Sequence, residues 1–120
     1  MRAERDRGAA TIFALAVGLT LVIAGMAGAS IGSARVGRHQ AHTAADLGAL
    51  AGASATIFGQ PAACARAERF VSANQARMTL CVVDGLEIVV RAEVEVRPMP
   101  GLTRHAGATS RAGPVYAPAE

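Results

Sequence analysis

The chain has few of the residues from which small domains usually build their cores. Its 120 residues include one Tyr, three Phe and no Trp. Any core must therefore be made of Ala, Val, Leu and Ile, which bury less surface than aromatic side chains do. Once a long uncharged run and a Pro/Gly-rich end are set aside, about 60 residues remain, near the lower limit for folding on one core. This length excludes a large catalytic domain.

Lysine is absent, and the twelve basic side chains are all Arg. Abundant Ala and Gly accompany this skew, a combination typical of GC-rich genomes, so the net charge of +3 is weak evidence for a nucleic-acid partner. Acidic residues are interleaved with the Arg, and no dense basic stripe with stacking aromatics accompanies them. A surface nucleic-acid-binding translocation factor would need the Arg residues within 66–77 and 91–111 to form one face, and it stays an alternative.

Charge is missing altogether from residues 8–34. A bilayer core is spanned by about 20 apolar residues, whereas the apolar part of a signal peptide needs only about 7 to 15. The run therefore predicts a transmembrane helix that follows a charged leader, residues 1–7. Because basic flanks favour the cytoplasmic side and the short leader can stay inside, we expect a single-pass protein of the cell membrane with a cytoplasmic N-terminus and an extracytoplasmic remainder.

Helical periodicity continues beyond this run, so residues 35–58 are predicted to extend the same helix into water. Apolar and small polar residues return at spacings of three, four and seven, which is typical of a helix. They are Val36, Thr43, Leu47, Leu50 and Ser54. Gly59 and Pro61 then end the helix, since Gly suits a C-cap and Pro cannot continue a helix but can open the next.

Small residues also recur every fourth position along this helix, a spacing that puts them on one face and lets another backbone approach closely. The candidate helix-packing residues are Ala10, Ala14, Gly18, Ala24, Gly28, Gly32, Gly48 and Gly52. Gly costs about 1 kcal/mol relative to Ala inside a lone helix. Its presence in the extension therefore indicates that something packs there.

Residues 59–97 are predicted to form a small α+β domain, a short helix packed on an antiparallel β-hairpin. The helix is expected from about Pro61 to Arg77, and strands over 78–83 and 86–97 flank Asp84-Gly85, a strong hairpin signal. With those two residues as the turn, Val83 would pair with Leu86 and Cys81 with Ile88. Residues 98–120, with Pro, Gly and few large apolar side chains, are expected to be a flexible tail.

The register places Cys81 on the apolar side of the hairpin, where the helix would carry Cys64 toward it. We therefore expect a Cys64–Cys81 disulfide, which closes a loop of about 18 residues and contributes roughly 3 kcal/mol on the chain-entropy model. Two buried reduced thiols are the alternative, which an extracytoplasmic location disfavours.

No arrangement of reactive side chains suggests an enzyme. His39, His42 and Asp46 could share one helix face, but no fourth ligand is suggested, so they are interpreted as solvated polar residues. Along residues 86–97, apolar and charged residues alternate, which predicts a half-buried strand with one apolar side. Its apolar side would consist of Leu86, Ile88, Val90, Ala92, Val94 and Val96, and Glu93 and Glu95 on the other side are interpreted as a solvated face. We predict no catalytic residues, no metal site, no cofactor and no small-molecule substrate.

Three features carry a resemblance to a known family. They are Arg7-Gly8-Ala9-Ala10 before the uncharged run, the long helix itself, and the segment Ala44-Ala45-Asp46-Leu47-Gly48-Ala49-Leu50-Ala51-Gly52-Ala53. Together they resemble the TadE/TadG-like proteins of tight-adherence (Flp) pilus assembly. The remainder, with its two Cys residues, is similar to small TadE-like proteins of high-GC Gram-positive bacteria related to secretion or DNA translocation.

The resemblance implies a membrane-anchored, pseudopilin-like structural component of a Tad/Flp pilus or related secretion apparatus. Its partners would be other pilus or secretion-machine subunits, met through the long helix. The resemblance also implies a leader-cleavage site between Gly8 and Ala9. Many such proteins carry Glu five residues beyond that Gly, where this chain has Phe13. A small secreted protein, released by signal peptidase near Ala27-Gly28-Ala29, is a further alternative.

Overall fold

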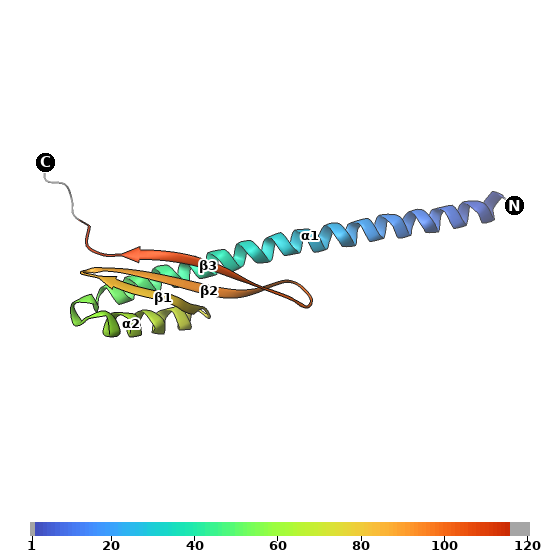
Figure 1. Ribbon diagram of the computed structural model, residues 1–120. Helices are drawn as coiled ribbons and strands as arrows, with labels where there is room; N and C mark the ends of the chain where they lie inside the picture. The colour runs from blue at the N-terminus through green and yellow to red at the C-terminus, as the bar shows by residue number, and fades with distance from the viewer. Residues whose placement is uncertain (1, 116–120) are drawn as a thin grey trace, which may run out of the picture.

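The computed structural model describes residues 2–115 and contains one long helix, a short helix and a three-stranded sheet (Figure 1). The fold is α+β, as predicted. In chain order the elements are α1 (Arg2–Ala53), the 3-10 turn η1 (Thr56–Phe58), α2 (Gln60–Ala73), β1 (Arg77–Asp84), β2 (Glu87–Met99) and β3 (Leu102–Ala112).

Helix α1 is continuous for 52 residues, and its N-terminal half projects alone from a small domain (Figure 1). The prediction that one helix continues from the uncharged run into the following residues is confirmed. The charged leader belongs to the same helix from Arg2, and the helix ends at Ala53, with η1 completing the predicted extension. The molecule is consequently elongated, with principal dimensions of 86 × 38 × 16 Å.

The domain has two layers, with α2 and the C-terminal half of α1 covering one face of an antiparallel sheet in the order β1-β2-β3. The predicted alternation of β2 is observed, since Ile88, Val90, Ala92 and Val94 are buried beneath the helices. Helix α1 lies on β2 and β3, whereas α2 packs beside α1 and reaches β1. The core is therefore a single layer of aliphatic side chains between helices and sheet.

The buried side of α1 consists of the smallest residues in the chain, not of the stripe predicted for residues 36–54. The buried residues are Gly37, Ala41, Ala44, Ala45, Gly48, Ala49 and Gly52. Val36 and Leu50, by contrast, are 67% and 68% exposed. An Ala/Gly face lets the backbone of α1 lie close to the sheet and to α2, so this short chain fills its core without aromatic side chains.

Glycine is required at three positions on this face because neighbouring atoms occupy the space of a side chain. A Cβ atom at Gly37 would lie 2.1 Å from Val96 Cγ1, and one at Gly48 would lie 2.6 Å from Val71 Cγ2. At Gly52 it would lie 2.5 Å from Ile88 Cδ1 and 3.0 Å from the carbonyl oxygen of Ala63. The expectation that something packs against Gly48 and Gly52 is met within the chain itself.

The hairpin turn lies one residue later than predicted. Val83 pairs with Ile88 and Cys81 with Val90, so the two central residues are Gly85 and Leu86. Gly85 has φ +63° while Leu86 keeps a negative φ, which is the arrangement of a type II′ turn with Gly at its first central position. The predicted register is wrong by two residues, and such an even shift leaves every side chain on its predicted face.

The predicted flexible tail is wrong for residues 102–112, which form β3 and pair with β2 along almost its whole length. Small inward residues, among them Ala106, Ala108 and Ala112, suit this strand because α1 lies directly over it. The tail prediction for residues 116–120 falls outside the described residues. Helix α2 also stops earlier than predicted, because Gln75 adopts a positive φ of 58° and turns the chain into β1.

Cys64 on α2 and Cys81 on β1 lie at disulfide distance. Their Sγ atoms are 2.02 Å apart and their Cα atoms 5.9 Å apart. This pair links α2 to β1, the strand of the sheet with which α2 makes most of its contacts.

Replacement of Gly52 by Val should destabilise the domain by about 2 kcal/mol or more, because the added atoms meet a backbone carbonyl as well as Ile88. Gly25→Val is the matched control, since nothing lies within 4 Å of a Cβ at Gly25. Urea titration of the full chain in detergent, read by protease resistance of the domain, measures the difference. Equal unfolding midpoints for the two variants would show that α1 does not lie as close to Ile88 and to the backbone of α2 as described.

The cysteine pair should protect both thiols from alkylation in the folded chain and stabilise the domain by roughly 3 kcal/mol. Mass spectrometry after alkylation under non-reducing conditions measures the first effect, and the urea midpoint of Cys64→Ser/Cys81→Ser measures the second. Free alkylation of both thiols in the native protein would rule out the bond.

Candidate functional site

The largest surface without a partner within the chain is the N-terminal half of α1. Every residue from 5 to 29 is exposed. Leu15, Leu19 and Val22 retain 58–69% of their surface. α1 is the one helix among the described residues that is long and apolar enough to cross a membrane. Exposed side chains of this kind are stable only in lipid or against another apolar surface.

The structure separates the predicted helix-packing residues into two groups. Gly48 and Gly52 are buried by α2 and β2 and are not available to another molecule. The remaining residues lie on the projecting half, are exposed, and comprise Ala10, Ala14, Gly18, Ala24, Gly28 and Gly32. Apart from the adjacent residues and the backbone of α1 itself, no atom of the described chain lies within 4 Å of a Cβ placed at Gly18, Gly28 or Gly32.

Larger apolar side chains continue along the outer side of α1 beyond the uncharged run. Val36 and Leu50 point away from the domain, and Leu47 between them is 39% exposed. Leu15, Val22, Val36 and Leu50 are separated by multiples of seven residues, so they form a stripe that winds by about 20° per heptad around a straight helix. An apolar strip therefore leads from the projecting half of α1 onto the back of the domain.

Asp46, the acidic residue of the Ala-Ala-Asp segment, connects α1 to β3. Its carboxylate accepts a hydrogen bond from the hydroxyl of Ser110 and lies 2.9 Å from Nδ1 of His42. These contacts give the carboxylate a structural role in holding β3 against α1. Ser110 was missed from the sequence because it lies in the segment predicted to be a tail.

His39 is exposed on the same helix, and the hydrogen bonds of this cluster involve only His42, Asp46 and Ser110. Among the residues that the structure describes, no group of three or more His, Cys, Asp and Glu side chains is close enough to hold a metal ion. The arrangement of His42, Asp46 and Ser110 also lacks the order of a catalytic triad, because the carboxylate lies between the imidazole and the hydroxyl.

The outer face of the sheet carries alternating charges in contact with one another. Glu93 lies between Arg77 and Arg91, at nitrogen–oxygen distances of 3.8 and 3.6 Å, and Glu95 lies 3.2 Å from Arg97. These exposed pairs each stabilise the fold by no more than about 1 kcal/mol. Acidic side chains thus interrupt the basic face that the nucleic-acid alternative requires.

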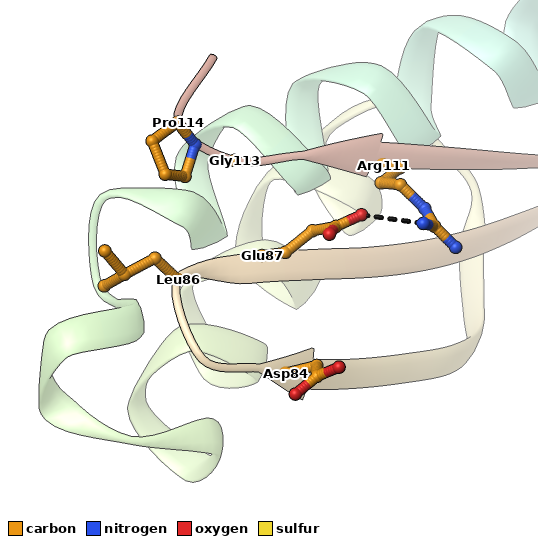
Figure 2. Close-up of a pocket in the computed structure, with 6 residues that line it drawn as sticks. All are labelled: Asp84, Leu86, Glu87, Arg111, Gly113 and Pro114. Atoms are coloured by element: carbon orange, nitrogen blue, oxygen red, sulfur yellow. Dashed lines mark ion pairs between the residues drawn. The ribbon is translucent and has the colours of Figure 1, made fainter. Parts of the chain in front are cut away.

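A shallow hollow of about 400 Å³ lies at the end of the sheet far from the projecting helix (Figure 2). Glu87 on β2 and Arg111 on β3 face each other there at 2.9 Å, with Asp84 on the neighbouring strand. Leu86, Gly113 and Pro114 complete the lining. The hollow holds one ion pair but no nucleophile beside a base, so its geometry offers no evident chemistry.

The implied leader-cleavage residues, Gly8 and Ala9, lie early in α1 and are exposed. Phe13, five residues beyond Gly8, is 71% exposed on the same helix. Cleavage at this position stays a prediction.

Comparison with known proteins identifies the segment that forms α1. Residues 8–55 match the family described as putative Flp pilus-assembly TadE/G-like. Comparison with curated proteins and with solved structures gave no match. The matched segment contains the projecting apolar half, the Ala/Gly face that packs on the sheet, and the Asp46 contact. The segment 8–55, which forms α1 and the turn after it, is thus similar to the TadE/G-like family of Flp pilus-assembly proteins.

Proposed function

We propose that the protein is a membrane-anchored, pseudopilin-like structural subunit of a Tad/Flp pilus or a related secretion or DNA-translocation apparatus. The observation that carries this proposal is that the two halves of α1 have different surroundings. One side of its C-terminal half supports the domain, whereas residues 8–29 carry no charge and are all exposed in the chain. The family match covers this helix and supports a pilus component.

Membrane anchoring follows from the free energy of the exposed side chains. Burying one Leu, Ile, Phe or Val side chain contributes about 1.5–3 kcal/mol, and the projecting half carries many of them. The proposed orientation puts the N-terminus in the cytoplasm and the domain outside. The short basic leader favours this orientation, as does the cysteine pair, which requires an oxidising compartment to form a bond.

Contact with neighbouring subunits is proposed to run through the small-residue positions of the projecting half. In lipid, the hydrophobic effect does not drive helices together, because lipid tails are as apolar as the side chains. Helices associate instead through van der Waals packing, which is closest where small residues let the backbones approach. Gly28 and Gly32 are four residues apart and have no neighbours within the chain, so they offer another helix close approach. The same open space means that changes there should leave the domain intact.

The proposed role is structural rather than enzymatic. The charged groups on the sheet pair with one another, and the described residues show no nucleophile aligned with a base. The likeness of the C-terminal part to the small TadE-like proteins of high-GC Gram-positive bacteria belongs to this proposal as well.

Replacement of both Gly28 and Gly32 by Leu should lower the recovery of the protein with its pilus or secretion partners, because the bulky side chains would prevent close helix packing. The control is Gly25→Leu, which changes a glycine with the same open surroundings but outside the predicted packing set. Co-purification from detergent-solubilised membranes measures recovery, and protease resistance of the domain shows that each variant is folded. Unchanged recovery of the double variant would contradict the proposed packing.

A further inference from the structure

The hairpin that joins β2 to β3 extends back along α1 toward its projecting half (Figure 1). The hydroxyl of Ser30 shares its hydrogen bond between two carbonyl oxygens, that of Met26 on its own helix at 2.9 Å and that of Pro98 on the hairpin at 3.1 Å. Ser30 lies inside the uncharged run, so the domain touches the proposed transmembrane segment itself. A tight turn at Gly101, with φ +80°, then returns the chain to β3.

The level of this contact along α1 places the hairpin tip at the edge of the bilayer. Ser30 lies four residues before the end of the uncharged run, a rise of about 6 Å along the helix axis. Head groups add about 5 to 7 Å to each side of a hydrocarbon core that is roughly 30 Å thick. If Arg35, the first charged residue after the uncharged run, sits in the outer head-group layer, Pro98 lies at the boundary between head groups and acyl chains.

The composition of the tip fits this boundary. Residues 98–102 carry no charge, and Met99 and Leu102 are 45% and 39% exposed although they pair with each other across the hairpin. Exposed apolar side chains contribute no favourable burial free energy in water, whereas they are stabilised when they insert at the start of the acyl chains.

Arginine side chains lie just behind the tip, on the side away from the membrane centre. Arg97 and Arg104 belong to the hairpin, and both are exposed. Arg35 and Arg38 are exposed on α1, where they border a hollow that Ile31 and Ala34 also line. Among the described residues, Glu95, which pairs with Arg97, is the one acidic partner of these four Arg residues. An apolar tip with cations behind it matches a surface of acyl chains covered by phosphate groups.

We propose that the β2–β3 hairpin tip inserts into the outer head-group boundary of the membrane that α1 crosses, and that the four Arg residues bind the phosphates of anionic phospholipids. This inference rests on the membrane anchoring proposed above. A second contact with lipid would fix the rotation of the domain about α1, so the exposed strip on the outer side of α1 would be presented to neighbouring subunits in one orientation.

The absence of Trp from the chain gives a direct test, because Met99→Trp introduces a single Trp fluorophore. The full chain is reconstituted into phosphatidylglycerol vesicles whose acyl chains are brominated near the head groups. Trp at position 99 is expected to emit at shorter wavelength than Trp in water and to lose most of its emission to bromine, with little loss to acrylamide. Leu102→Trp should behave alike and replaces the first variant if Met99→Trp does not fold.

Leu86→Trp is the matched control, because Leu86 is 48% exposed in the other hairpin turn, at the end of the sheet far from α1's projecting half. Its emission should be quenched by acrylamide and not by brominated lipid. In phosphatidylcholine vesicles the quenching of Trp at position 99 by brominated lipid should fall, and Arg97→Gln/Arg104→Gln should cause a similar fall in phosphatidylglycerol. Free inorganic phosphate should not restore it, because the proposed ligand is the lipid surface.

Several outcomes would overturn the inference. If both hairpin variants respond as Leu86→Trp does while the chain floats with the vesicles, insertion is wrong and anchoring stands. If the chain does not float, both the anchoring and the inference fail. Protection of Trp at position 99 from both quenchers would indicate coverage by protein, and equal quenching in the two lipids would remove the role of anionic head groups.

Discussion

The close packing of an Ala/Gly face of α1 on the sheet is the contact on which the rest of the molecule depends. Between Gly37 and Gly52 this face has almost no side-chain volume, and Val96, Val71 and Ile88 approach the helix backbone directly. Close packing of this kind gains dispersion energy over many atoms and excludes water without needing large side chains. It explains how a chain poor in aromatics forms a core, and why that core is only one layer thick.

The same packing lets α1 support the domain and still expose apolar side chains for other contacts. Because the domain needs only the smallest residues of α1, the larger apolar residues are left on the outer side, as Leu50 is, or on the projecting half. The membrane, the domain and a neighbouring subunit can thus each use a different part of one continuous rod. The hairpin contact at Ser30 adds a fixed relation between the rod and the domain near the proposed membrane surface.

The strongest periodic signals in the sequence predicted their elements well. The uncharged run, the alternation of β2 and the Asp84-Gly85 signal gave the long helix, the buried strand face and the hairpin. Periodicity could not find β3, because its small residues are apolar only in the context of α1 above it. It also favoured the Val36–Leu50 stripe as a helix face, since hydrophobicity scales cannot show that Ala and Gly are preferred where backbones approach closely. Gly37 and Ser110 were missed because their roles depend on tertiary contacts, that of Gly37 with Val96 and that of Ser110 with Asp46.

Hydrogen exchange of the full chain in lipid vesicles tests the central packing most directly. If α1 lies against the sheet as described, amides of residues 37–52 and those of β2 should exchange slowly and at a common rate, because the two segments would open only together. Fast exchange across residues 37–52 while β2 stays protected would contradict this account, since the sheet would then be stable without the helix.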